Sequence, residues 1–187
     1  VLENPEDREE KAKFWNIDVD FLPTKRGLFQ TDIYRAIETG EIKGLWLIAT
    51  NPLSSLPNTG RVRKAMEKLE FCAVQDCYED TESAQYAHVF LPAGTWAEKS
   101  GVMTNTERRV NLVKPIIEPI GDSKPDFWIF TEMAKRFNVD NKVDFPATSE
   151  VVFEEMKLLS KGRLCDISGM DYEKIEKTAK LNILKSF

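Results

Sequence analysis

The chain has 187 residues, of which 42% are hydrophobic and 10% aromatic, and its formal net charge is -5. This content is enough to bury one sizeable core, so we expect a single domain over residues 1–187. The acidic balance argues against nucleic-acid binding through broad phosphate neutralisation. No run approaches the roughly 20 apolar residues of a membrane span, and the acidic start ENPEDREEK lacks signal-peptide features, so we expect a cytoplasmic protein.

Helices and strands alternate through the first half of the chain. Thr31 is predicted to N-cap a helix that stops at Gly40. Apolar strands are expected at 45–49, 71–74 and 89–91, with helices between them at 61–69 and near 81–86. Nearly all-apolar strands separated by single helices predict βαβ units and a mainly parallel sheet covered on both faces. The expected fold class is therefore α/β, a Rossmann-like three-layer domain.

The pattern changes after the third strand. Residues 97–118 have no helical period, although 109–113 alternate enough for a short strand or extended arm. Amphipathic helices are expected from Asp126 and over 151–159, with a connection at 138–148 and a charged helix near the end. The predicted organisation is an N-terminal extension at 1–30, a sheet core with cofactor loops at 31–137, and a helical C-terminal segment at 138–187.

The cysteine and histidine content excludes several kinds of site within this chain. Cys72, Cys77 and Cys165 contain no CxxC pair, so they cannot complete a four-cysteine cluster and are expected to be reduced thiols. His88 is the single histidine and is expected at a strand edge. We therefore predict no catalytic triad and no metal-ligating residues here.

Polar residues follow the ends of the predicted strands. Asn51 comes after the first strand, Gln75 and Asp76 after the second, and Lys99 lies in the loop region after the third. In open parallel sheets, ligands bind at the carboxyl ends of the strands. A carboxylate there can accept hydrogen bonds from ribose hydroxyls or a guanine edge, and a lysine can neutralise a phosphate. The expected ligand is a polar, anionic cofactor.

Each of these residues also has a simpler structural interpretation. Asp76 and Asn51 can cap the turns that follow them, Lys99 can be a solvated surface residue, and Asp126 can be the N-cap of its helix. The chain contains neither GxGxxG nor GxxxxGK[ST], so an ordinary dinucleotide fingerprint and a P-loop are absent.

Three segments carry a family resemblance: ATNPLSSLPNTGRVRKAMEKLEF, VQDCYEDTESAQYAHVFLPAGTWAEKSGVMTNTERR and GDSKPDFWIF. They resemble the catalytic subunit of the molybdopterin oxidoreductases, and within that family the nitrate reductases of the assimilatory type. NPEDREEKAKFWNI and the LP-x-K-x-G pattern at 22–27 are also similar to the nitrate reductase branch, and the similarity extends to GRLCDISGMDY. Nearly the whole chain is covered.

The resemblance implies a molybdenum ion held by two molybdopterin guanine dinucleotides, served by a 4Fe-4S cluster. By motif match, the implied cofactor contacts are Asn51, Gln75, Asp76, Lys99 and Asp126. Glu98, Asn105 and Arg108 lie in the same motif and are expected to support its loop. The chain is then expected to hold the guanosine end of one dinucleotide.

The family pattern is incomplete in this chain. The cluster-binding cysteine motif, the molybdenum-ligand segment and the closing barrel-like domain do not appear, so the chain resembles an internal fragment that is inactive alone. The implied partners are the remaining domains of the subunit, an electron-donor protein or subunit, and nitrate. Two alternatives stay open: a fragment of a formate dehydrogenase or other oxyanion reductase, and a non-catalytic nucleotide-binding or assembly module.

Overall fold

The structure is a computed structural model that describes residues 3–137 and 148–184, with side chains of the last helix described as far as Thr178. The chain divides into two compact units. Unit 1 comprises Val1–Gly94 and Gly121–Lys124, and unit 2 comprises Thr95–Ile120 and Pro125–Phe187. The single domain expected over 1–187 stays a prediction.

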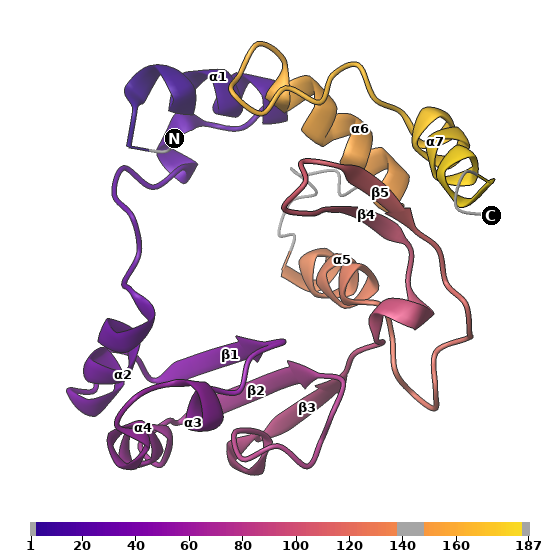
Figure 1. Ribbon diagram of the computed structural model, residues 1–187. Helices are drawn as coiled ribbons and strands as arrows, with labels where there is room; N and C mark the ends of the chain where they lie inside the picture. Colours follow the sequence, from indigo (N-terminus) through magenta and orange to yellow (C-terminus); the bar gives the residue numbers. More distant parts are fainter. Residues whose placement is uncertain (1–2, 138–147, 185–187) are drawn as a thin grey trace. The chain divides into compact units, whose positions relative to one another are not determined.

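A parallel sheet forms the centre of unit 1. Its strands are β1 (Gly44–Ile48), β2 (Phe71–Asp76) and β3 (Val89–Pro92), in the order β1-β2-β3 (Figure 1). Both strand pairs are parallel, with Leu47 opposite Val74 and Val74 opposite Phe90. The predicted strands are therefore confirmed, and β2 extends through Gln75 and Asp76 because β3 pairs with both.

Three α-helices and one short 3-10 helix of unit 1 pack on one face of this sheet. They are α2 (Gln30–Glu38), α3 (Pro52–Ser55) and α4 (Thr59–Met66), together with the short 3-10 helix η2 (Ala84–Tyr86). The buried core joins them to alternate residues of the strands, and it comprises Tyr34, Ile37, Leu47, Leu53, Val62, Ala65, Met66, Leu69, Cys72, Val74 and Ala84. Side chains of a strand alternate between its two faces, so the intervening residues, including Ala73 and Gln75, lie on the opposite face. The α/β class is confirmed, and these helices supply one of the two expected outer layers.

The start of α2 corrects one prediction. The helix begins at Gln30 after Phe29, whose backbone carbonyl accepts the first helical hydrogen bonds from Asp32 and Ile33. Thr31 therefore lies inside the first turn, where its side chain cannot act as the N-cap, and that prediction is wrong. The predicted stop at Gly40 is confirmed, since Gly40 has a φ of +78° and directly follows Thr39, the C-cap of the helix.

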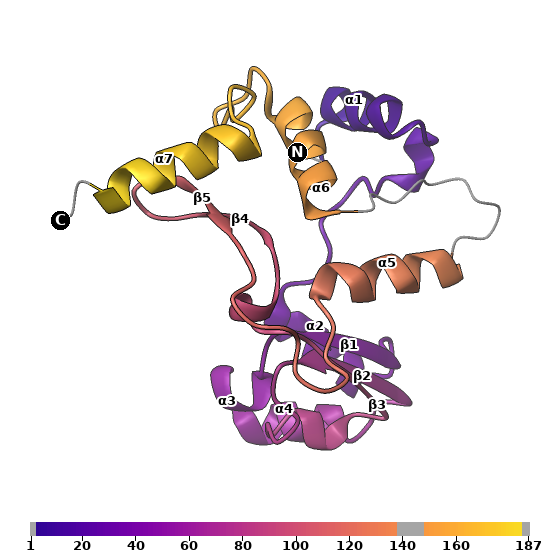
Figure 2. The ribbon, with the colours of Figure 1, turned by 90° about the vertical axis from the view of Figure 1, so that its right-hand side faces the viewer.

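Unit 2 is built from a hairpin and helices. Strands β4 (Gly101–Thr104) and β5 (Val110–Val113) pair antiparallel, and the helices are α5 (Asp126–Phe137), α6 (Ser149–Ser160) and α7 (Tyr172–Leu184). Helix α7 contacts β5 and α6 contacts β4, so the hairpin has helical neighbours (Figure 2). The strand at 109–113 and the helices after Asp126 and at 151–159 are confirmed, whereas β4 was not predicted.

The sequence did not predict the first helix, α1 (Pro5–Trp15). Asn4 caps it by accepting a hydrogen bond from the Glu6 backbone, and Pro5 occupies the first helical position. A 3-10 turn, η1 (Val19–Phe21), follows. In the described part of the chain, no helix combines the length and apolar content needed to cross a membrane. The predicted connection at 138–148 lies almost wholly outside the described residues.

Candidate functional site

Three loops follow the carboxyl ends of the parallel strands in unit 1. We call residues 49–51, 76–83 and 93–94 the strand-end loops. The backbone N–H of Ala49 donates to the carbonyl of Gln75 at 2.8 Å, and that of Ala93 donates to the carbonyl of Asp76 at 2.9 Å. These bonds continue the sheet ladder past β1 and β3, so the loops start side by side, as the parallel topology predicted.

The Asn51 amide joins the first two strand-end loops. Its Nδ2 donates to Oε2 of Glu82 at 2.6 Å, and its Oδ1 accepts from the Ser83 hydroxyl at 2.6 Å. Ser83 is fully buried, and its Oγ also accepts from the backbone N–H of Leu53 at 3.3 Å. Ala49, two residues before Asn51, adopts the uncommon positive φ of +51°. Asn51 is therefore held in place by both ends of its amide.

The same network fixes a negative charge beside Asn51. The hydrogen bond from the Asn51 amide is the largest of the effects that hold the pKa of Glu82 below its ordinary value, and the Glu82 backbone N–H adds to it. Glu82 is therefore a carboxylate at neutral pH. Neither Glu82 nor Ser83 was identified from the sequence, because their contacts to Asn51 span 31 and 32 residues.

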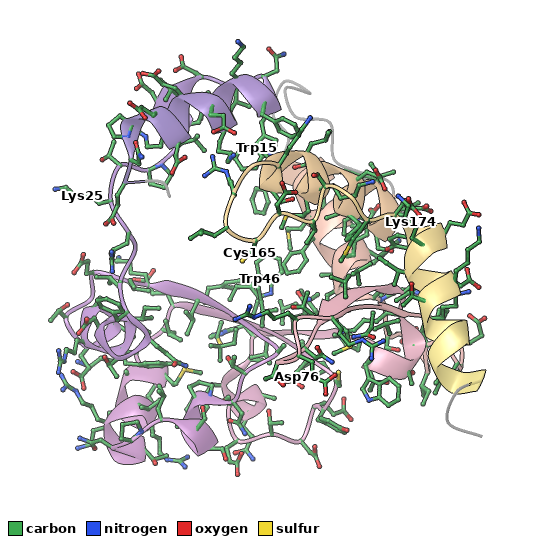
Figure 3. All side chains as sticks on the ribbon, turned by 45° about the horizontal axis from the view of Figure 1, so that its top comes forward. Trp15, Lys25, Trp46, Asp76, Cys165 and Lys174 are labelled. Carbon is green, nitrogen blue, oxygen red and sulfur yellow. The ribbon has the colours of Figure 1, made fainter. Side chains whose placement is uncertain are left out.

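Asp76 stands at the end of β2 and organises the second strand-end loop (Figure 3). Its Oδ1 accepts from the backbone N–H groups of Cys77 at 2.7 Å and Tyr78 at 3.3 Å. The second carboxylate oxygen, Oδ2, has no hydrogen-bond partner among the described residues. The side chain is half-buried. Asp76 thus caps its own turn and still presents an acceptor.

Gln75 occupies the opposite face of the sheet from the α2 and α4 core, and its side chain is completely buried. In this conformation the amide is part of the interior. Its role as a cofactor contact stays a prediction.

The segment Gly121–Lys124 lies against the third strand-end loop. Ala93 forms a parallel bridge with Lys124, and Gly94 N–H donates to the Lys124 carbonyl at 2.9 Å. The Cys77 thiol donates to the Gly94 carbonyl across 3.6 Å, which ties the second loop to the third. The three loops are thereby linked by hydrogen bonds of backbone and side chains.

The two remaining predicted contacts, Lys99 and Asp126, lie in unit 2. The Lys99 ammonium makes an ion pair with Oδ2 of Asp126, at the start of α5. Both side chains are about a quarter to a third exposed, at 32% for Lys99 and 25% for Asp126. The predicted set therefore falls into two groups: Asn51, Gln75 and Asp76 in unit 1, and the Lys99–Asp126 pair in unit 2.

Glu98 fixes the backbone next to Lys99. Its Oε2 accepts from the Thr95 N–H at 2.5 Å, completing a capping box, and its Oε1 accepts from the Ile120 N–H at 2.9 Å. These backbone hydrogen bonds, that from Thr95 first, lower the pKa of Glu98. The side chain is 5% exposed. The expected role of Glu98 as a loop support agrees with these contacts.

The carboxylate and amide groups of the strand-end loops suit the nucleoside part of a cofactor. Asp76 and Glu82 supply carboxylate oxygens and Asn51 an amide, which match the N–H donors of guanine and the hydroxyls of ribose. A phosphate would meet repulsion from two carboxylates. Among the described residues, no group of three or more His, Cys, Asp or Glu side chains is placed to hold a metal ion. The residues of the strand-end loops fit a guanosine end.

Comparison with known proteins identifies the family. The model of the family described as Molybdopterin oxidoreductase matches residues 18–136. The chain belongs to the molybdopterin oxidoreductase family. The matched range contains Asn51, Gln75, Asp76, Lys99 and Asp126, and family membership implies a molybdopterin cofactor. The resemblance found in the sequence is confirmed.

Nitrate reductases are among the relatives of this molybdopterin oxidoreductase chain. It is 39% identical over 180 residues to a nitrate reductase of Synechocystis sp., covering 96% of this chain and 25% of that protein. It is 35% identical over 176 residues to the assimilatory nitrate reductase catalytic subunit of Bacillus subtilis, covering 94% and 24%. The chain thus spans about a quarter of the length of these relatives.

The similarity extends to proteins with other names. The F420-dependent formate dehydrogenase subunit alpha of Methanocaldococcus jannaschii is 35% identical over 140 residues, covering 74% of this chain and 20% of that protein. Among solved structures, acetylene hydratase from Pelobacter acetylenicus superimposes with a TM-score of 0.62 and 22% identity, over 91% of this chain and 23% of that one. The structural match supports the fold alone.

Proposed function

We propose that the chain is the part of a molybdenum-dependent nitrate reductase that holds the guanosine end of a molybdopterin guanine dinucleotide. The observation that carries the proposal is the Asp76 carboxylate, which caps its own turn through Oδ1 and leaves Oδ2 as an acceptor. A guanine edge presents paired N–H donors, for which a carboxylate is the matching acceptor. The similarity to nitrate reductases, including the assimilatory enzyme of Bacillus subtilis, supports the choice of reaction.

In this proposal some residues would bind the cofactor and others would hold the binding residues in place. Asp76 would bind guanine or ribose, and Asn51 would steady the nucleoside after exchanging one of its present partners, Glu82 or Ser83. Lys99 and Asp126 would contact the cofactor as a pair whose charges already offset each other. Gln75 would act from within the sheet, where its buried amide shapes the end of β2.

In the intact subunit, the bound cofactor would supply the redox chemistry that converts nitrate to nitrite with two electrons and two protons, releasing water. The electrons would arrive from a donor protein or subunit through a 4Fe-4S cluster in another part of the subunit. This chain would contribute placement of the cofactor and no catalytic residue. We place the enzyme in the cytoplasm, consistent with an assimilatory role.

A guanine nucleotide tests the recognition step on this chain. A ligand at about 100 times its Kd stabilises the folded state by about 2.7 kcal/mol. For a chain of this size that corresponds to a rise of roughly 5 to 10 °C in melting temperature. Measured in excess inorganic phosphate, so that the phosphate group shared by the two nucleotides does not set the result, GMP should produce such a rise and AMP, which lacks the paired donors of guanine, should produce much less. Equal stabilisation by GMP and AMP would contradict guanine recognition.

A formate dehydrogenase is the second candidate, because a formate dehydrogenase alpha subunit is 35% identical to 74% of this chain. The nucleotide-binding role would be the same for both enzymes. The intact subunit separates them directly: nitrate-dependent oxidation of a reduced dye supports the first candidate, and formate-dependent dye reduction supports the second.

A further inference from the structure

A basic groove lies between β5 and α7 in unit 2, and none of its lining residues belongs to the strand-end loops of unit 1. It has a volume of about 250 Å³. We call it the anion groove and define it by its polar residues Arg108, Arg109, Asn111 and Lys174 and its apolar residues Val110 and Ile175. Figure 3 marks Lys174 on α7. The groove therefore combines three cationic side chains with an apolar wall.

The turn that carries the two arginines is held by Asn105. Its Oδ1 accepts from the backbone N–H groups of Glu107 at 3.1 Å and Arg109 at 3.0 Å. Its own N–H donates to the Arg109 carbonyl at 3.1 Å, and Arg108 N–H donates to the Asn105 carbonyl at 3.0 Å. Arg108 adopts a φ of +59°, a conformation that glycine or asparagine adopts more readily. The turn thus presents both arginines from a fixed backbone.

The acidic groups near the groove are mostly engaged with other cations. On α7, Glu173 pairs with Lys177 at 2.5 Å and Glu176 pairs with Lys114 at 2.8 Å. Asp171 pairs with Lys174 at 2.9 Å and offsets part of its charge. The exposed Glu107 lies at the tip of the turn.

The charges of the two groove arginines are not offset by ion pairs in the described part of the chain. Among the described residues, neither Arg108 nor Arg109 makes an ion pair. The excess positive charge therefore comes from Arg108 and Arg109.

We propose that the anion groove binds a phosphoryl group, either of free phosphate or of a small phosphorylated metabolite. Guanidinium groups match the oxygens of a phosphate through paired N–H donors, and Lys174 adds an ammonium beside them. The volume is below the range of about 300 to 1,000 Å³ typical of drug-sized ligands, which favours a small anion. The acidic strand-end loops lack this chemistry, so the groove is a second, chemically different site.

Phosphate titration of the ¹⁵N-labelled chain, at constant ionic strength, tests this proposal. The Nε–Hε signals of Arg108 and Arg109 and the amides of the Asn105 turn should shift and saturate. The double variant Arg108→Gln, Arg109→Gln should bind roughly tenfold or more weakly. Arg136→Gln is the matched control, because Arg136 pairs with Glu132 on α5 in the same unit; it should bind like the parent chain. Shifts that fail to saturate, or that persist in the double variant, would overturn the proposal.

Two further ligands define the chemistry and the source. Glycerol phosphate binding more tightly than phosphate would assign the groove to phosphorylated metabolites, and equal binding would assign it to the free ion. Succinate binding more tightly than both would contradict a phosphoryl site. Asp76→Asn should leave phosphate affinity unchanged, so failure of this proposal and failure of guanosine recognition give different results.

Discussion

The buried Ser83 hydroxyl donates to Oδ1 of Asn51 at 2.6 Å and so joins the loop after β1 to the loop after β2. Because the same oxygen of Ser83 accepts from Leu53 N–H, a single small side chain holds Asn51 and the start of α3 together. The first of the strand-end loops is therefore positioned by a residue of the second.

Ser83→Ala should destabilise the chain by about 1 to 3 kcal/mol, because it removes the Asn51 contact and leaves the Leu53 N–H unsatisfied. Urea unfolding followed by circular dichroism measures the change. Ser54→Ala is the matched control, since Ser54 is an exposed serine on the adjacent α3, and it should alter stability by less than about 0.5 kcal/mol. Equal effects of the two substitutions would contradict the assigned role of Ser83.

Glu98→Gln should lower the stability of unit 2 at neutral pH. It should also make that stability fall less as the pH is lowered. Backbone donors lower the pKa of Glu98 in the folded state, so its contribution is present above the ordinary glutamate pKa. That contribution is lost as the pH falls from about 4.3 through the lowered folded value. Melting temperatures of the parent and variant chains between about pH 6 and 3 check this prediction. An equal fall of the melting temperature with pH in both chains would contradict it.

The Lys99–Asp126 pair should contribute little to stability. Both side chains are partly exposed, so water and salt screen their attraction. A double-mutant cycle with Lys99→Gln and Asp126→Asn should give a coupling of about 0.2 to 1 kcal/mol that shrinks in 1 M salt. A coupling of several kcal/mol would mean that the pair is structural, and its availability to a cofactor would then be in doubt.

The three cysteines should differ in reactivity. Cys72 is completely buried in the unit 1 core, and burial raises the pKa of its thiol, whereas Cys77 and Cys165 are exposed. Iodoacetamide should label Cys77 and Cys165 in the native chain and Cys72 only after unfolding, as read by peptide mass spectrometry. Labelling of Cys72 at the same rate as Cys165 would contradict the described core.

The sequence was most informative where local pattern and long-range pairing agree. The apolar runs of β1, β2 and β3 are each closed by a turn signal, so their positions followed directly. The apolar run predicts that β2 ends at Val74, whereas Gln75 and Asp76 also belong to the strand, because Leu91 and Pro92 pair with them.

Other elements depend on contacts between residues distant in the sequence, which local sequence patterns do not predict. Strand β4 is only GVMT, and it forms because β5 pairs with it across the turn held by Asn105. Thr31 is a good capping residue by type, but α2 begins at Gln30, two residues too early for Thr31 to be its N-cap.

The candidate site was also predicted only in part from the sequence. The topology of parallel strands was sufficient to bring Asn51 and Asp76 to one edge of the sheet. Their present partners were not predictable, because Ser83 and Glu82 reach Asn51 only after the loop that follows β2 has folded back.

The central claim is that the Asp76 carboxylate recognises the guanosine end of the cofactor. The most direct test is the molybdenum and guanine content of the purified intact subunit carrying Asp76→Asn, compared with Asp80→Asn, an exposed residue of the same loop. Asparagine keeps an acceptor for the Cys77 and Tyr78 N–H groups, so the turn should persist while the second carboxylate oxygen is lost. The account predicts reduced cofactor content for Asp76→Asn and parent-like content for Asp80→Asn. Full cofactor content in Asp76→Asn would contradict it.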